Sequence, residues 1–357
     1  MIKKECFTAE WIEQVSSELH YNDKNLIEKV IRALSLLEML VKAGCPLVFK
    51  GGTALMLILG KSAHRLSIDI DLICPPGTNI EDYLKSFADF GFINLELVER
   101  KQRDDADIPK SHSKFFYQIA YRNDTDAQSY ILLDVLYEDI HYFRTQQIAI
   151  NCPFIRLEGK PLMVTVPSAE DILGDKLTAF APNTTGIPYY RNGRSCSMEI
   201  AKQLYDVGRL FENVSDLQIT KEAFRKIAVV ELSYRSFGTD IGQVFNDIRQ
   251  TALCISTRGK AGKGDFDLIQ DGIIRVKSFM YKQRYLIDHA IIDAARAAYL
   301  ATLIEKGINE IESYSNNPAD IKDMVIRPSL PNKLNKLRSN LPEAYYYWAK
   351  TSELLEA

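Results

Sequence analysis

The sequence lacks the features by which exported and membrane proteins are commonly recognised. Its first residues, MIKKECFTAEWIEQ, contain no apolar run of the kind that forms the core of a signal peptide. No stretch approaches the roughly 20 uncharged apolar residues that a membrane-spanning helix needs. We therefore expect a cytoplasmic protein that makes no membrane contact.

Cysteine and histidine are few, and neither sign of charge predominates. The six cysteines stand singly without a Cys-x-x-Cys pair, and the five histidines are scattered. This pattern argues against a zinc site, so any metal should be held by oxygen ligands. The formal net charge of −3 excludes binding to nucleic acid through overall positive charge. A nucleic-acid partner would need a local basic patch.

The length and the order of hydrophobic patterns predict two domains. A chain of 357 residues exceeds the size at which a single core usually stops growing. Short β runs alternate with helical patterns up to residue 166, and helical patterns prevail after Pro167. We predict an α/β (α+β) fold, in which residues 1–165 form a mixed β-sheet with flanking helices and residues 166–357 form a helical bundle.

A glycine turn lies between a short apolar strand and a helix. A helical stripe over 23–43 ends at Gly44, residues 46–50 read as a strand, and Gly51-Gly52 opens a helix over 53–59. Glycine lets an anion approach the backbone, and the N–H groups of a helix N-terminus attract phosphate. Thr53 adds a hydroxyl donor. The segment thus predicts a phosphate-binding turn.

Three aspartates follow on predicted strands. In LSIDIDLIC, residues 66–74, the strand period of two places Ser67, Asp69 and Asp71 on one face. Asp134 lies in the later β run LLDVLYED. Carboxylates are the ligands that Mg²⁺ prefers, and two such ions about 3.5–4 Å apart serve phosphoryl transfer. We predict that Asp69, Asp71 and Asp134 hold two Mg²⁺ ions.

Each of these signals has an ordinary structural explanation when it stands alone. A Gly-Gly turn is usually only a turn, and an Asp-x-Asp pair on a strand is often surface polarity. Their order, with the glycine turn and helix before the aspartate pair and a third aspartate on a later strand, favours phosphoryl transfer.

At these residues the chain resembles the AbiEii/AbiGii-type nucleotidyltransferase toxins of the DNA polymerase β-like nucleotidyltransferase superfamily. The superfamily hallmark is matched by Lys50-Gly51-Gly52-Thr53 and by Asp69-Ile70-Asp71-Leu72, and the AbiEii form adds Arg65 and Ser67. The resemblance implies that Gly51, Gly52, Thr53, Arg65 and Ser67 bind the nucleotide. It also implies that Asp69 and Asp71 bind metal and that Asp134 is the third ligand or general base.

A second motif of that family covers residues 175–206. It reads Asp175-Lys176-Leu177-Thr178-Ala179, then Arg191 and Arg194, then Lys202-Gln203-Leu204-Tyr205-Asp206. The resemblance implies that Lys176 contacts the NTP phosphates and that Asp206 is a functional acid that orients this lysine. The chain departs from the pattern at Lys202 and Gln203. Without the resemblance, the alternatives are that Lys176 is a lysine whose stem crosses a core face and that Asp206 is a charge on a helix surface.

The resemblance implies a Mg²⁺-dependent nucleotidyltransferase that moves a nucleoside monophosphate from an NTP to RNA, with the tRNA 3′ end as acceptor. Such a protein is the toxin of a type IV toxin–antitoxin or abortive-infection system, and its helical domain closes over the active-site cleft. Two basic stretches, 257–264 and 327–338, are acceptor contacts or solvated faces. Transfer to a small molecule, as in aminoglycoside nucleotidyltransferases, and a non-catalytic binding module are the alternatives.

Overall fold

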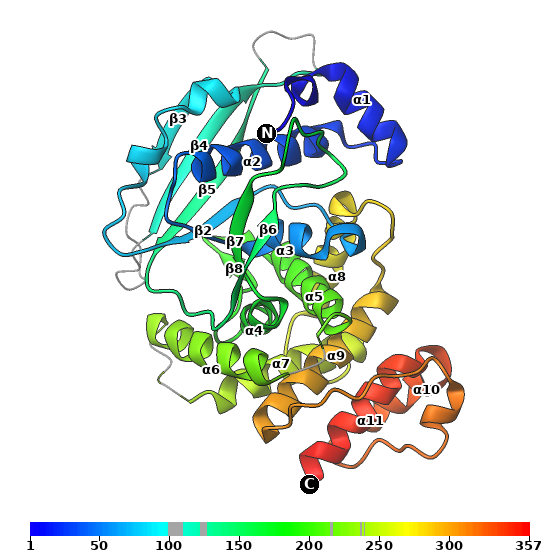
Figure 1. The fold of residues 1–357 in the computed structure, drawn as a ribbon. Coiled ribbons are helices and arrows are strands. Elements are labelled where there is room, and N and C mark those ends of the chain that lie inside the picture. Colours follow the sequence, from blue (N-terminus) through cyan, green and yellow to red (C-terminus); the bar gives the residue numbers. More distant parts are fainter. Residues whose placement is uncertain (99–109, 122–126, 215–216, 236–237, 239) are drawn as a thin grey trace. The chain divides into compact units, whose positions relative to one another are not determined.

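The computed structural model describes residues 1–357 except 99–109, 122–126, 215–216, 236–237 and 239. The chain forms two compact units. Unit 1 comprises Met1–Ser168 and Ser278–Arg284, and unit 2 comprises Ala169–Lys277 and Tyr285–Ala357 (Figure 1). The predicted division between residues 165 and 166 stays a prediction about domains, and the sequence did not indicate the return of 278–284 to the first unit.

Unit 1 is built on a five-stranded mixed sheet with the order β1-β2-β5-β4-β3. The strands are β1 (Val48–Lys50), β2 (Ile70–Cys74), β3 (Asn94–Val98), β4 (Lys110–Gln118) and β5 (Gln128–Tyr137). β2 and β5 are parallel, and the other neighbours are antiparallel. A separate antiparallel pair consists of β6 (Thr145–Ala149) and β7 (Met163–Pro167). The mixed sheet with flanking helices confirms the predicted fold class.

Helix α2 (Lys24–Lys42) supplies the main apolar layer of unit 1. Asp23 caps it by accepting a hydrogen bond from the Leu26 N–H at 3.0 Å, as the sequence predicts. Its apolar stripe, with Leu34 and Leu37, is fully buried in the core that includes the sheet. The other helices of this unit are α1 (Ala9–Glu18) and α3 (Gly51–Leu59), with short 3₁₀ turns at Lys4–Phe7, Gly60–Ser62, Ile80–Tyr83 and Phe87–Phe90.

The sequence over residues 80–90 predicts one helix that ends before Gly91, and this prediction was wrong, because the segment forms two 3₁₀ turns. The bonds run from residue i+3 to residue i, as in Leu84 N–H to the Glu81 carbonyl and Phe87 N–H to the Leu84 carbonyl. The break between the turns lets Ile80, Leu84 and Phe90 all reach the core. Gly91, with φ of +81°, ends the second turn.

A carboxyl group is buried on α2 with little compensation. Glu38 Oε2 accepts the Ile2 N–H at 2.9 Å, while its Oε1 has no hydrogen-bond partner in the part of the chain that the structure describes. Burial raises the pKa of Glu38, and the Ile2 N–H opposes that shift. The folded state therefore holds the Glu38 proton more tightly than the unfolded state does.

We expect Glu38→Gln to change how stability depends on pH. The stabilising contribution of the Glu38 proton is complete below the unfolded pKa, taken as 4.5, and is lost as pH rises through the raised folded pKa. Glutamine does not ionise, so the melting temperature of the variant relative to that of the wild type should rise as pH increases from about 5 to about 8. Thermal unfolding measures this gain. The exposed Glu18→Gln is the control, and a difference independent of pH would contradict the prediction.

Unit 2 is helical apart from the short hairpin of β8 (Tyr190–Arg191) and β9 (Arg194–Ser195). Its helices are α4 (Ala169–Ala179), α5 (Ser197–Phe211), α6 (Leu217–Tyr234), α7 (Gly242–Ser256), α8 (Phe266–Val276), α9 (Ile287–Lys306), α10 (Leu337–Asn340) and α11 (Pro342–Glu356). No helix among the described residues is long and apolar enough to cross a membrane. The helical character of this part agrees with the sequence.

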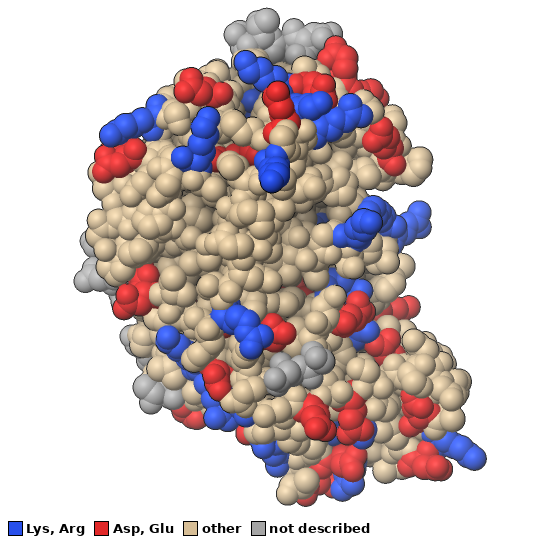
Figure 2. All heavy atoms as spheres, in the orientation of Figure 1, with Lys and Arg blue, Asp and Glu red and all other residues tan. Residues whose placement is uncertain are grey.

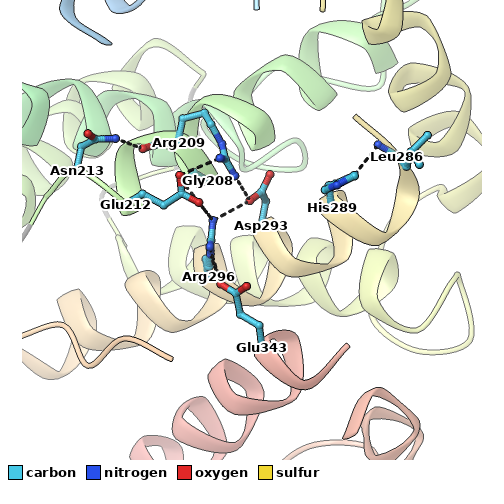
Figure 3. Close-up of polar contacts among 9 residues, drawn as sticks. All are labelled: Gly208, Arg209, Glu212, Asn213, Leu286, His289, Asp293, Arg296 and Glu343. Carbon is cyan, nitrogen blue, oxygen red and sulfur yellow. Dashed lines mark hydrogen bonds and ion pairs between the residues drawn. The ribbon is translucent and has the colours of Figure 1, made fainter. Parts of the chain in front are cut away.

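An ionic cluster joins three of these helices (Figure 3). Arg296 of α9 pairs with Glu212 next to α5 at 2.9 Å and with Glu343 of α11. Asp293, which is almost completely buried, accepts from Arg296 at 3.3 Å and lies 3.6 Å from Arg209. Burial raises the pKa of Asp293, and the two arginines oppose that shift. Such a cluster fixes which helices meet, because each buried charge needs its partner.

Candidate active site

One row of side chains crosses the sheet of unit 1. In the strand register Lys50 pairs with Asp71, Asp71 with Asp134, and Asp134 with His112. Residues paired in this way point to the same face of a sheet, and neighbouring strands lie about 4.8 Å apart. The register therefore brings two of the three predicted carboxylates together, although they are 63 positions apart in the sequence.

The glycine turn at the start of α3 lies directly against these residues. Gly51 has φ of +77°, and a Cβ atom at this position would lie 2.0 Å from Oδ2 of Asp71. A Cβ atom at Gly52 would lie 2.7 Å from the Ser67 hydroxyl oxygen and 3.0 Å from Nη2 of Arg65. A side chain at either position would displace these groups, and at Gly51 the positive φ adds backbone strain. The turn brings three predicted site residues, Arg65, Ser67 and Asp71, to the N-terminus of α3.

The N-terminus of α3 has the positive end of the helix dipole, although α3 itself has no charged side chain. The sequence GGTALMLIL contains no charged residue. Figure 2 shows an uncharged area where β6, β7 and α3 lie in Figure 1, and none of the three contains a lysine, arginine, aspartate or glutamate. The first N–H groups of a helix lack partners within the helix and carry its positive dipole end. With the buried Arg65 beside them, they form a place for anionic oxygens.

Thr53 has a role within the protein. Its fully buried hydroxyl donates to the carbonyl oxygen of Asp69 at 2.7 Å. This bond fixes the backbone that carries Asp69. The direct contact between the Thr53 hydroxyl and a phosphate stays a prediction.

The strand that carries the aspartates is shorter than predicted. It begins at Ile70, so Asp69 precedes it and is exposed. The backbone of the preceding residues is bonded elsewhere: the Leu66 N–H donates to the Phe279 carbonyl at 2.8 Å, and Arg65 forms a bridge with Met280. A ladder with a neighbouring strand therefore cannot extend to Ser67.

His112 is a candidate site residue that the sequence analysis missed. Its Nδ1 contacts Oδ1 of Asp134 at the centre of the row. The ring is buried, and its Nε2 has no hydrogen-bond partner among the described residues. His112 comes to lie beside Asp134 through the register of β4 on β5. A histidine in the alternating run KSHSKFFYQ gave no indication by itself.

The donor set suits a cation that prefers oxygen. Asp71 and Asp134 are adjacent, and Asp69 is two residues upstream of Asp71. Carboxylate oxygens of this kind are typical ligands of Mg²⁺. In the described part of the chain, however, no group of three or more His, Cys, Asp or Glu side chains is already arranged around a metal position. The residues therefore suit Mg²⁺ by the chemistry of their donor oxygens, and the adjacent Asp71 and Asp134 supply the main carboxylate pair.

In unit 2 the structure brings the two residues of the second motif into contact. Lys176 Nζ of α4 lies 3.0 Å from Oδ2 of Asp206 on α5, and both side chains are buried. The same ammonium donates to Gln203 Oε1 at 3.0 Å. Gln203, where the chain departs from the family pattern, is thus the second partner of the lysine. Arg191 and Arg194 are exposed on the β8–β9 hairpin.

The two basic stretches of the sequence make contacts within unit 2. Lys333 donates to the carbonyl oxygen of Lys260 at 2.6 Å, which joins one stretch to the other. Arg327 pairs with Glu356 at 3.6 Å, and Arg338 donates to the Ile321 carbonyl at 3.1 Å. A cavity of about 640 Å³ in this unit, beside the Arg296 cluster, is lined by none of the predicted site residues.

Several solved structures are similar to this chain, and the following are three of them. JHP933 from Helicobacter pylori is 17% identical, with 79% of this chain and 94% of that chain covered and a TM-score of 0.40. A putative nucleotidyltransferase from H. pylori is 18% identical, with 79% of this chain and 94% of that chain covered and a TM-score of 0.38. MenT4, a nucleotidyltransferase toxin from Mycobacterium tuberculosis, is 11% identical, with 95% of this chain and 98% of that chain covered and a TM-score of 0.44. No curated protein matches the chain.

A family model identifies the chain over most of its length. The model of the nucleotidyl transferase AbiEii toxin of type IV toxin–antitoxin systems matches residues 34–320, which include the glycine turn, the three aspartates, Lys176 and Asp206. The match confirms the resemblance that the two motifs indicated. The protein therefore belongs to the AbiEii family of nucleotidyltransferase toxins.

Proposed function

We propose that this nucleotidyltransferase moves a nucleoside monophosphate from an NTP to the 3′-terminal hydroxyl of an RNA, with tRNA as the acceptor. The adjacent pair of Asp71 and Asp134, with the α3 glycine turn packed on Asp71, is the observation that carries the proposal. In the cell the protein would act in the cytoplasm as the toxin of a type IV system, held in check by a separate antitoxin.

In the proposed reaction the acceptor oxygen bonds to the α-phosphorus, the bond to pyrophosphate breaks, and the acceptor proton leaves with the solvent or with a carboxylate. Gly51 and Gly52 would hold the triphosphate at the N-terminus of α3, with Arg65 and Ser67 beside it. Asp71, Asp134 and Asp69 would hold Mg²⁺. When bound, the metal supplies charge neutralisation at the phosphate oxygens.

Lys176 and Asp206 belong to the proposal as the functional pair of unit 2. Their support is the family motif and their buried contact, which holds the ammonium in one position. A lysine held in this way is a suitable partner for phosphate oxygens. Gln203 would take part in the same positioning.

The test is label transfer with purified protein, Mg²⁺ and total tRNA. Each NTP is supplied in turn with ³²P at the α-position and, separately, at the γ-position. The proposal expects label on tRNA from one or more α-labelled NTPs and none from the γ-labelled forms, since pyrophosphate is released. Transfer of the γ-label would indicate a kinase reaction. α-Label on aminoglycosides but not on tRNA would favour the small-molecule alternative, and no transfer to any acceptor would favour a non-catalytic binding module.

A further inference from the structure

Two aromatic rings lie on the same face of the sheet as the paired aspartates. Tyr130 of β5 is four residues before Asp134, and Phe116 of β4 is its partner in the register. Residues four apart on a strand share a face and are about 13 Å apart. The two ring centroids are 5.7 Å apart, and Tyr130 is 43% exposed. An aromatic pair with an exposed tyrosine and a partly exposed phenylalanine thus lies on the same sheet face as the carboxylates.

Two lysines come to the Tyr130 ring from different elements. The Nζ atom of Lys29, on α2, is 5.5 Å from the ring centroid, and that of Lys114, on β4, is 5.4 Å away. Burial lowers the pKa of Lys29, and the carboxylates of Asp69 and Asp23 oppose that shift. Two ammonium groups thus lie close to one aromatic ring.

This combination matches the chemistry of single-stranded nucleic acid. Aromatic side chains on an exposed sheet face stack with unpaired bases, and lysines beside them bind the phosphates that link those bases. Cation–π contacts of the two ammonium groups also hold the ring in place when no ligand is bound. Neither a purely apolar partner nor a free anion would use both features.

The position of the rings indicates which substrate they serve. In the sheet order β1-β2-β5-β4-β3, the glycine turn follows β1, and the rings lie on β5, the strand of Asp134, and on the next strand, β4. In an in-line displacement at phosphorus the attacking and leaving oxygens are on opposite sides. With the triphosphate at the glycine turn, the attacking hydroxyl comes from the side of β5 and β4.

We propose that Tyr130, Phe116, Lys29 and Lys114 form a platform that stacks an unpaired base near the 3′ end of the acceptor RNA and binds its adjacent phosphates. This inference rests on the proposed function, because it assigns the acceptor side of the same site. According to this inference the platform helps to select the acceptor, while the glycine turn binds the NTP.

The first test separates the two substrates. Tyr130→Ala should raise the dissociation constant for a 12-nucleotide single-stranded RNA about tenfold, measured by fluorescence anisotropy without NTP. Tyr130→Phe should bind as the wild type does, because stacking needs the ring only. In transfer assays Tyr130→Ala should raise the KM for RNA and leave the KM for NTP within about twofold. The matched control is Leu97→Ala, on the opposite face of the same sheet, where the leucine is 48% exposed.

The second test measures the lysines by their salt dependence. Each phosphate contact to a single strand contributes a slope of about 0.7 to the plot of log affinity against log salt. Lys114→Met should therefore reduce the slope by about that amount. Glu96 lies 3.6 Å from Lys114 and competes for its charge, so Glu96→Gln should tighten RNA binding about two- to threefold. Opposite effects of two neighbouring changes are not expected from a general loss of structure.

The outcomes distinguish this inference from the proposed function. RNA binding that is unchanged in both Tyr130→Ala and Lys114→Met would overturn the platform, even if the wild type labels tRNA. A rise in the KM for NTP alone would assign the rings to the nucleotide base and overturn the acceptor assignment. If the wild type labels no RNA but Tyr130→Ala still weakens RNA binding, the proposed function fails while the platform stands as an RNA-binding surface.

Discussion

Replacing Asp71 by asparagine is expected to abolish nucleotide transfer, with a loss of at least about a thousandfold, and to leave the melting temperature of the metal-free protein close to that of the wild type. The loss follows because Asp71 is at the centre of the row, next to Asp134 in the parallel register and in contact range of Gly51. A neutral amide cannot supply the charge that a divalent cation and a triphosphate require. At about 1.4 kcal/mol per factor of ten, the loss corresponds to roughly 4 kcal/mol.

The effect on stability has a separate cause. In the strand register Asp71 lies between Lys50 and Asp134. The like charge opposite Asp134 is destabilising and the unlike charge opposite Lys50 is stabilising, each by up to about 1 kcal/mol, so asparagine removes two contributions of opposite sign. Transfer of α-labelled nucleotide and thermal unfolding with and without Mg²⁺ measure the two effects. The exposed Asp139→Asn, close to the end of β5, is the control and should change neither. A variant that retains transfer would remove Asp71 from the proposed site, whereas one that melts well below the wild type would give Asp71 a structural role.

Gly51→Ala is expected to lower transfer about a hundredfold and to destabilise the protein. An alanine Cβ at this position would be 2.0 Å from Oδ2 of Asp71, a distance that forces the carboxylate or the turn to move. The positive φ of +77° adds roughly 1–2 kcal/mol of backbone strain for any L-residue with a side chain. Transfer should fall together with stability, because the carboxylate that the alanine displaces is the Asp71 carboxylate assigned to the reaction.

Gly44 provides the matched control for Gly51. It has φ of +75°, and a Cβ atom there would meet nothing within 4 Å. Gly44→Ala should therefore lower the melting temperature through backbone strain and leave the transfer rate per folded molecule unchanged. Comparison of the two variants, by thermal unfolding and by label transfer normalised to folded protein, separates strain from displacement of Asp71. Equal activity in both would show that the close packing of Gly51 on Asp71 is irrelevant to the reaction.

Local patterns of the sequence predicted much of unit 1, while the pairing of distant segments lay beyond them. Helix α2, its Asp23 cap and the strand-turn-helix at Gly51 all follow from periodicity and from the preferences of single residues. The start of β2 at Ile70 depends instead on a hydrogen bond that the Thr53 hydroxyl donates and on one that the Phe279 carbonyl accepts, and both residues are distant in sequence. The register of β4 on β5 places His112 opposite Asp134. The sequence could not predict this, because the alternation of apolar and polar residues shows which face of the sheet a residue is on but not which residue of the next strand it lies beside.

The family motif predicted the site more sharply than the residue patterns did. Asp69 and Asp71 followed from spacing, whereas Lys176 and Asp206 had ordinary readings as core and surface residues until the resemblance joined them. Their contact at 3.0 Å is consistent with that joint assignment. The aromatic pair of Tyr130 and Phe116 was hidden in apolar strands, since a sequence does not show which face of a sheet is left uncovered.

The return of Ser278–Arg284 to unit 1 affects when this unit can be completed during synthesis. The Tyr281 N–H donates to the His64 carbonyl at 2.9 Å, and the neighbouring Phe279 and Met280 hold the segment that leads to Asp69. These residues follow Ser168 by about 110 positions, which at 5–20 residues per second takes a ribosome roughly 5 to 20 seconds. A nascent chain that already displays all three aspartates therefore still lacks the segment that braces them. For a toxin, this delay keeps an incomplete chain on the ribosome from carrying a finished site, and a truncated product that ends before Ser278 would be incomplete in the same way.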